Sequence, residues 1–167
     1  MEVIIIFTAI LQSMSVSLGV GGSTLAIINF FVALSDGKID KCERRMMGIV
    51  YTVLRIAMLL ILLTTGLLTI FQYAIYGPTY FTPFVIGFWL LISVLFINAL
   101  LMTLRVIPSS FGPALQAASW YTMGILMALF SLGLYSFSFL QFSIGYAVIL
   151  SSIIILFNGI LIILKNN

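Results

Sequence analysis

The chain has 167 residues, of which 63% are hydrophobic and only 7% are charged, and its mean hydropathy is +1.30. Soluble domains carry about 25% charged and about 45–50% apolar residues, so this chain lacks the polar residues needed to cover a surface in water. The composition excludes disordered, collagen-like and nucleic-acid-binding proteins, and a single cysteine excludes an internal disulfide. It indicates an all-α polytopic membrane protein.

Five stretches are long and apolar enough to cross a bilayer, whose hydrocarbon core takes about 20 residues of helix. They cover about residues 3–34, 41–74, 84–104, 114–135 and 142–164. The sequence therefore predicts one transmembrane helical domain over residues 1–167, built as a bundle of five transmembrane helices.

The first stretch carries a stripe of small residues. They recur at intervals of three or four and so share one face of a helix: Ser15, Gly19, Gly22, Ser23 and Ala26. Side chains this small let two helices approach closely in lipid, which predicts helix packing. Because Gln12 and Asn29 lie at the two ends of the same face, the alternative is the wall of a pocket or a mobile contact.

The connection after the first stretch has the residues of a turn and a helix start. Asp36-Gly37 is typical of a turn, and Asp40 is followed three positions later by Glu43, the pattern of an N-cap with its reciprocal partner. We expect the second helix to begin near Lys41 and to form a long antiparallel hairpin with the first.

The later stretches contain neutral polar residues deep in their apolar sequence. Asn98 and Asn158 each need a partner, since an unsatisfied amide in hydrocarbon costs several kcal/mol. They could bond one another or Gln12 across a small bundle. The sequence thus offers a candidate intramembrane polar pocket of Gln12, Asn29, Asn98 and Asn158, and the alternative is that these residues only hold the helices together.

The basic residues predict the orientation in the membrane. They form a collar of Lys38, Lys41, Arg44, Arg45, Arg55 and Arg105, whereas the second and fourth connections carry no charge. Cytoplasmic loops retain Lys and Arg, so the N-terminus is predicted outside and the C-terminus in the cytoplasm. Beyond setting this orientation, the collar could bind anionic lipid head groups or an acidic partner.

The first hairpin resembles a known group of proteins. Its run from Leu11 to Thr24, with Gly19 and Gly21-Gly22, and the later Asp36-Gly37-Lys38-Ile39 are similar to small uncharacterised bacterial multi-pass membrane proteins and, more distantly, to the copper-resistance-D-like membrane family. The resemblance covers about the first 60 residues and implies a bacterial cytoplasmic membrane. That family often carries a histidine where this chain has Gln12, so the metal or haem function that the resemblance implies lacks its imidazole ligand.

The sequence supplies no catalytic or metal-binding constellation. It has no histidine, and its acidic residues lie outside the predicted spans, which leaves neither a nucleophile with its base nor a ligand set. Cys42 and Met46, one helical turn apart, are the weak candidates for a cuprous ion. We expect no enzyme activity and no cofactor.

Two functions remain. The first is a non-catalytic integral membrane protein that acts through helix packing, as an accessory subunit or a homo-oligomer; its partners would be membrane lipid, a membrane protein or a second copy, and not nucleic acid. Its motivation is the small-residue stripe, together with outer loops that are aromatic and uncharged. The alternative is a small-molecule or copper transporter or binding protein with a neutral polar pocket.

Overall fold

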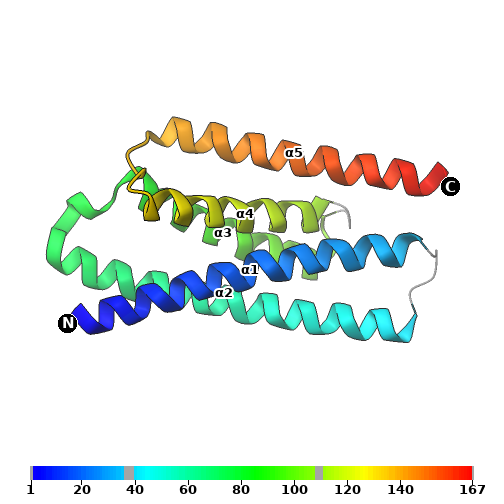
Figure 1. Ribbon diagram of the computed structural model, residues 1–167, viewed down its shortest axis with the longest axis horizontal. Helices are drawn as coiled ribbons and strands as arrows, with labels where there is room; N and C mark the ends of the chain where they lie inside the picture. The colour runs from blue at the N-terminus through cyan, green and yellow to red at the C-terminus, as the bar shows by residue number, and fades with distance from the viewer. Residues whose placement is uncertain (1, 36–39, 108–110, 167) are drawn as a thin grey trace.

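The structure, a computed structural model, describes residues 2–35, 40–107 and 111–166, and within them it is all-α (Figure 1). It contains five α-helices and one short 3-10 helix: α1 (Glu2–Ser35), α2 (Lys41–Tyr76), η1 (Gly77–Tyr80), α3 (Pro83–Thr103), α4 (Phe111–Ser131) and α5 (Phe139–Asn166). Successive helices run in opposite directions, and the two termini lie at opposite ends of the molecule (Figure 1). The predicted helical class and the number of helices are confirmed.

Four of the helices are long and apolar enough to cross a membrane, which indicates an integral membrane protein. The spans lie within Glu2–Ala33, Lys41–Tyr80, Pro83–Thr103 and Phe139–Ile163. α1 is unbroken over 34 residues, about 50 Å, and α2 over 36 residues. Both are longer than the roughly 30 Å hydrocarbon core, so they must tilt or project from it.

The stretch predicted at 114–135 corresponds to α4, which begins three residues earlier and ends four residues earlier than predicted. α4 is not among those four helices because its sequence is less apolar than theirs. The packing explains this composition. α4 contacts α1, α3 and α5, and its five consecutive residues from Gln116 to Trp120 are all buried. A helix surrounded by other helices exposes little surface to lipid, so it can carry serine, glutamine and alanine where an exposed helix needs leucine or isoleucine.

Local capping fixes where two helices begin. Asp40 caps α2 as predicted: its carboxylate accepts a hydrogen bond from the Glu43 backbone N–H (2.6 Å), and the Glu43 carboxylate accepts one from the Asp40 N–H (3.0 Å). Ser138 and Gln141 form the same reciprocal pair at the start of α5. α5 therefore begins at Phe139, three residues before the predicted start.

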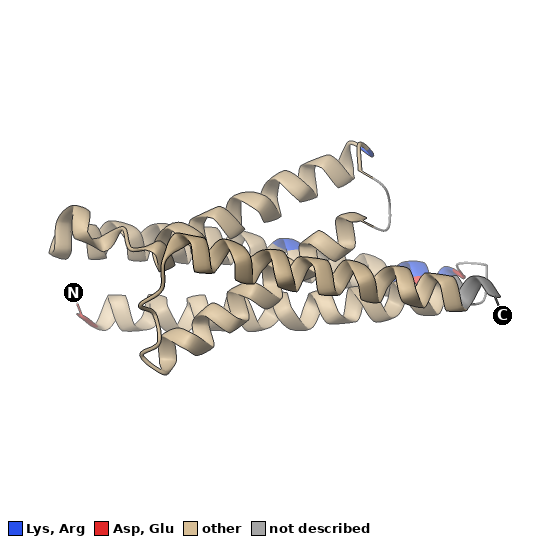
Figure 2. Cartoon of the chain, turned by 90° about the horizontal axis from the view of Figure 1, so that it is seen from above, with Lys and Arg blue, Asp and Glu red and all other residues tan. Residues whose placement is uncertain are grey.

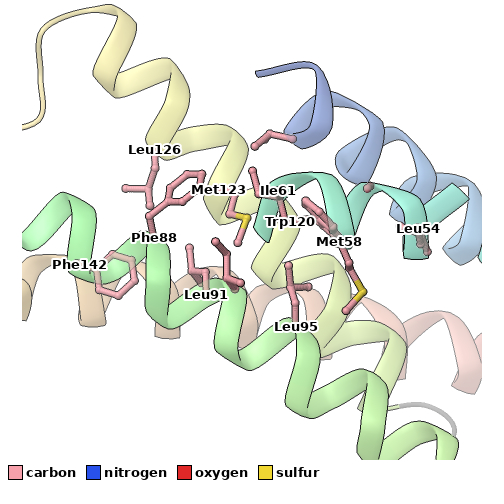
Figure 3. Packing of buried hydrophobic residues seen from close by; sticks show 13 residues of the cluster. Leu54, Met58, Ile61, Phe88, Leu91, Leu95, Trp120, Met123, Leu126 and Phe142 are labelled. Carbon is pink, nitrogen blue, oxygen red and sulfur yellow. The ribbon is translucent and has the colours of Figure 1, made fainter. Parts of the chain in front are cut away.

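The core lies where α2, α3 and α4 meet, and α1 and α5 add to it. Figure 3 shows side chains from α2, α3, α4 and α5 directed toward one another. The buried cluster includes Leu54, Met58, Ile61, Phe88, Leu91, Leu95, Trp120, Met123, Leu126 and Phe142. A second, smaller cluster joins α4 to α5 through Ala114, Ala118, Ile153 and Phe157. Large apolar side chains also cover the outside, as expected where the solvent is lipid.

Candidate functional site

The two ends of the molecule differ in charge. All described lysines and arginines that belong to the collar are exposed: Lys41, Arg44, Arg45, Arg55 and Arg105. Figure 2 shows the basic residues between the middle of the molecule and the end where the C-terminus lies, which we call the basic end, while Glu2 lies at the other end. Lys38 lies outside the described residues.

The opposite end, which we call the aromatic end, carries η1 and the connection 132–138, and neither segment has a charged residue. Its rings pack against one another: Phe84 stacks on Phe130 with centroids 5.2 Å apart, and Phe130 meets Tyr135 at 5.6 Å. These rings contact one another within the chain, although Phe130 and Tyr135 also remain exposed.

Arg105 occupies a backbone position that usually belongs to glycine. It has φ 55°, its N–H donates to the Met102 carbonyl, and the next N–H, of Val106, donates to Leu101. Gly133 closes α4 with the same pair of bonds. A non-glycine residue in this left-handed conformation costs about 1 kcal/mol. The sequence thus keeps a positive charge at the end of α3 at a small loss of stability.

The predicted stripe on α1 faces the interior of the bundle. Ser15, Gly19, Gly22 and Ser23 are buried, and Ala26 is half-buried. A Cβ at Gly19 would lie 2.2 Å from a ring carbon of Trp120, and one at Gly22 would lie 3.0 Å from Leu54 Cδ2. These distances leave no room for a larger side chain, so the stripe is in contact with α2 and α4 of the same chain.

A second small-residue face on α1 points away from the bundle. Ala9, Ser13, Ser17 and Gly21 follow one another at intervals of four, and a shallow groove between Ile6 and Leu18 runs along the first three. A Cβ at Gly21 would meet nothing within 4 Å. The hydroxyls of Ser13 and Ser17 donate to carbonyls of their own helix, at 3.1 and 3.0 Å. The sequence interpretation missed this face, although its four-residue spacing was the available signal.

The structure does not bring the four residues of the candidate polar pocket together. Gln12 and Asn29 are 17 positions apart on one unbroken helix, which separates them by about 26 Å along its axis. Gln12 donates from Nε2 to Thr65 Oγ1 (2.9 Å) on α2. Asn158 is exposed on the outside of α5, whereas Asn98 is buried to 1% exposure.

Asn98 instead bonds a residue that the sequence interpretation did not select, Gln116 on α4. Its Nδ2 donates to the Gly112 carbonyl oxygen (2.9 Å) and to Gln116 Oε1 (3.0 Å). Gln116 Nε2 then has the sulfur of Met58 at 3.4 Å as its acceptor. Asn98 Oδ1 is buried without a hydrogen-bond partner among the described residues.

Gln116 is part of the wall of a cavity of about 230 Å³ enclosed by α1, α2, α3 and α4. The cavity is lined by Ser23, Ala26, Ile27, Tyr51, Leu54, Arg55, Met58, Ala99, Met102, Thr103, Pro113 and Gln116. Tyr51, Arg55 and Thr103 are exposed, so the cavity opens on the side where α2 faces α3. We call it the inner cavity.

Arg55 and the end of α3 line the same cavity. Arg55 follows the first residue of α2 by 14 positions, about 21 Å along the helix axis, and Thr103 is the last residue of α3. At the basic end α1, α2 and α5 extend past the start of α4 (Figure 1). Arg55 therefore lies deeper in the molecule than Lys41, Arg44 and Arg45.

Cys42 and Met46, the weak candidates for a metal site, are exposed on the first turns of α2. Within the part of the chain that the structure describes, no three or more histidine, cysteine, aspartate or glutamate residues are grouped so as to hold a metal ion. The two side chains therefore stand alone as possible ligands there.

Comparison of the chain with protein-family models, with curated proteins and with solved structures finds no match. The resemblance of the first hairpin to the copper-resistance-D-like family stays a prediction, carried by its residues alone.

Proposed function

We propose that the protein is a non-catalytic integral membrane protein with five spans, which associates with a second copy of itself through the outer face of α1. α4 would be the fifth span. Its 21 residues extend about 31 Å, the thickness of the hydrocarbon core, and it runs antiparallel to the α3 and α5 spans that it contacts. Burial by its neighbours accounts for its lower hydropathy.

The proposed orientation places the basic end in the cytoplasm and the aromatic end outside. The argument is the separation of charge along the molecule, because short cytoplasmic loops retain Lys and Arg and aromatic residues collect at the membrane interface. Arg105, two residues after the end of α3, would then mark the inner boundary of the hydrocarbon.

The single observation that carries the proposed association is the exposed face of Ala9, Ser13, Ser17 and Gly21. Helices in lipid gain little from the hydrophobic effect on meeting, so they associate where small residues allow close van der Waals contact. The inner stripe is covered by Trp120 and Leu54 and is not available to a partner. The outer face is the small-residue surface of α1 that remains open.

A second copy is favoured over an unrelated subunit as the occupant. Across a two-fold axis, two copies of α1 present the same face to each other. The small residues of one helix then leave room for the larger side chains that flank the small residues of the other. An accessory subunit would need matching ridges on another protein, and the chain contains no signal that specifies one.

The test is the mass of the particle in mild detergent, measured for wild type and two glycine variants. Wild type is expected to be a dimer and Gly21→Leu a monomer, because leucine would project from the outer face and keep the second helix from approaching closely. Gly145→Leu on α5 is the matched control, since Gly145 is exposed and a Cβ there also meets nothing within 4 Å. It should remain a dimer. A wild-type monomer at high concentration, or equal dissociation by both variants, would contradict the proposal.

Copper binding has less support than association. The family histidine is absent at Gln12, and Cys42 and Met46 are exposed to the surroundings of the protein rather than enclosed in a pocket. The sequence based the small-molecule alternative on four polar residues that the structure does not bring together. Its support in the structure is the inner cavity instead.

A further inference from the structure

The inner cavity has a hydrogen-bond arrangement that gives one amide donor only a weak acceptor. The Gly112 carbonyl oxygen can only accept, so it requires the amide nitrogen of Asn98 to point toward it. Gln116 must then turn its oxygen toward that same nitrogen, which directs its own nitrogen toward the Met58 sulfur. One backbone carbonyl thus fixes the orientation of both side-chain amides.

The consequence is a buried carboxamide with spare donors on the cavity wall. The Gln116 nitrogen carries two hydrogens, and the acceptor that the structure gives it is a thioether, which accepts only weakly. Gln116 is 9% exposed and lines the cavity. A ligand oxygen in the cavity would be a better acceptor than the sulfur, and satisfying a buried donor is worth more than satisfying one in water.

The mouth of the cavity carries its single charge. Arg55 lines the opening together with the hydroxyl-bearing residues Tyr51 and Thr103, and the described residues include no carboxylate among the cavity lining. A guanidinium presents a planar fork of donors that matches a phosphate. The remaining wall is mostly apolar, with Leu54, Met58 and Ala99 among its members.

We infer that the inner cavity binds the head group of an anionic phospholipid. The phosphate would lie against Arg55 at the mouth, and the uncharged glycerol portion would occupy the interior and offer an oxygen to Gln116. A cavity of about 230 Å³ far exceeds the roughly 10–15 Å³ that one water needs on the same measure, so it has room for a head group. The chains would leave through the opening between α2 and α3 into the surrounding lipid.

A lipid is favoured over a soluble phosphate ester because of where the cavity opens. Thr103 at its mouth is the last residue of α3, next to the proposed inner boundary of the membrane, where anionic head groups are concentrated. This inference uses the proposed orientation but not the proposed dimer, because the outer face of α1 lies elsewhere on that helix.

The experiment measures lipid binding to the whole protein in neutral detergent by native mass spectrometry. The probes are phosphatidylglycerol, phosphatidylcholine and sn-glycerol 3-phosphate. We expect one phosphatidylglycerol per chain, bound at least tenfold more tightly than phosphatidylcholine, and no binding of glycerol phosphate at the same concentration. Glycerol phosphate bound as tightly as the lipid would overturn the lipid assignment.

Two kinds of variant locate the site. Arg55→Gln should weaken phosphatidylglycerol binding at least tenfold, whereas Arg45→Gln, which removes the same charge from an exposed position outside the cavity, should change it less than twofold. Equal losses would show that the lipid binds the collar in general and not the cavity.

Filling the cavity without changing charge gives the second variant. Ala99→Leu places a larger side chain on the cavity wall and should also abolish phosphatidylglycerol binding. If Ala99→Leu does not fold, Ala26→Leu fills the cavity from α1 and takes its place. The unfolding midpoint measured without lipid establishes which variant is folded. A folded, cavity-filled variant that binds phosphatidylglycerol as wild type does would refute the inference, whatever the oligomeric state.

Discussion

The two small-residue faces of α1 are alike in sequence and opposite in environment. One runs through Ser15, Gly19 and Gly22 and is buried; the other runs through Ser13, Ser17 and Gly21 and is exposed. Both have helical spacing, and both are made of glycine and serine. The difference is that a large side chain, Trp120, reaches the first face and none reaches Gly21. Small residues therefore mark a helix face to which another helix can come close. The packing of the other helices decides whether that face is covered by the same chain.

Trp120 shows how strongly this close contact is preferred. Its ring is fully buried over Gly19, while its indole N–H is buried without a partner among the described residues. A buried unsatisfied donor costs about 1–3 kcal/mol. The van der Waals contacts of a large ring against a bare helix backbone must outweigh that loss for the arrangement to persist.

The largest expected effect comes from removing the partner of the inner face. Trp120→Ala should lower the free energy of unfolding by about 3–5 kcal/mol, because it leaves a large void between α1 and α4. The measurement is denaturant unfolding in detergent, followed by tryptophan fluorescence of the remaining Trp89 or by circular dichroism. A loss below 1 kcal/mol would show that Trp120 does not hold α1 in place.

A smaller but sharper effect separates the two faces directly. Gly19→Ala should destabilise by about 1–3 kcal/mol, because the added methyl would sit 2.2 Å from a Trp120 ring carbon. Gly21→Ala makes the same chemical change in open space and should stabilise by up to about 1 kcal/mol through helix propensity. Similar values for the two variants would remove the distinction between the faces.

The same pair gives a test of cause. In a Trp120→Ala background, Gly19→Ala should cost close to nothing, because the atoms it collides with are gone. If Gly19→Ala keeps its full cost there, the destabilisation comes from the helix and not from Trp120.

The smallest expected effect concerns polar side chains one position apart on α1. Gln12→Leu removes the hydrogen bond to Thr65 on α2 and should destabilise by about 0.6 kcal/mol, the average for such bonds between membrane helices. Ser13→Ala removes a hydroxyl that bonds only its own helix in the described structure, and should change stability by less than about 0.3 kcal/mol. Parallel unfolding curves for the three proteins provide the comparison. A larger loss from Ser13→Ala would place an unrecognised contact on the outer face.

Features encoded by neighbouring residues were predictable. Asp40 and Glu43 are three positions apart and form the expected capping pair, because every group involved belongs to one helical turn. Ser138 and Gln141 offered the same signal at the start of α5, and the predicted start fell three residues late because that signal was not used. The inner stripe of α1 was likewise visible as a periodicity.

The candidate polar site was less predictable, because it depends on how deep each polar residue lies in the bundle and on which neighbouring helix its side chain faces. Asn98 was selected for its position in an apolar helix, but its partner Gln116 belongs to a helix whose polar residues were not singled out. Asn158 has the same residue type and a similar sequence context, yet it is exposed on α5. Nothing within either stretch states which side of the helix another helix will cover.

The sequence by itself determined that the chain is helical, where its long apolar segments lie and how its charges divide between alternate connections. Each of these features belongs to a single helix or loop in lipid, so composition and periodicity are enough to predict it. Only the tertiary structure decided which face of α1 is covered, that α4 is enclosed by its neighbours, and that Arg55 and Gln116 line one cavity. Those outcomes depend on the relative rotation and depth of several helices. They are set by large side chains such as Trp120 fitting against small ones, a relation between distant residues that no local pattern contains.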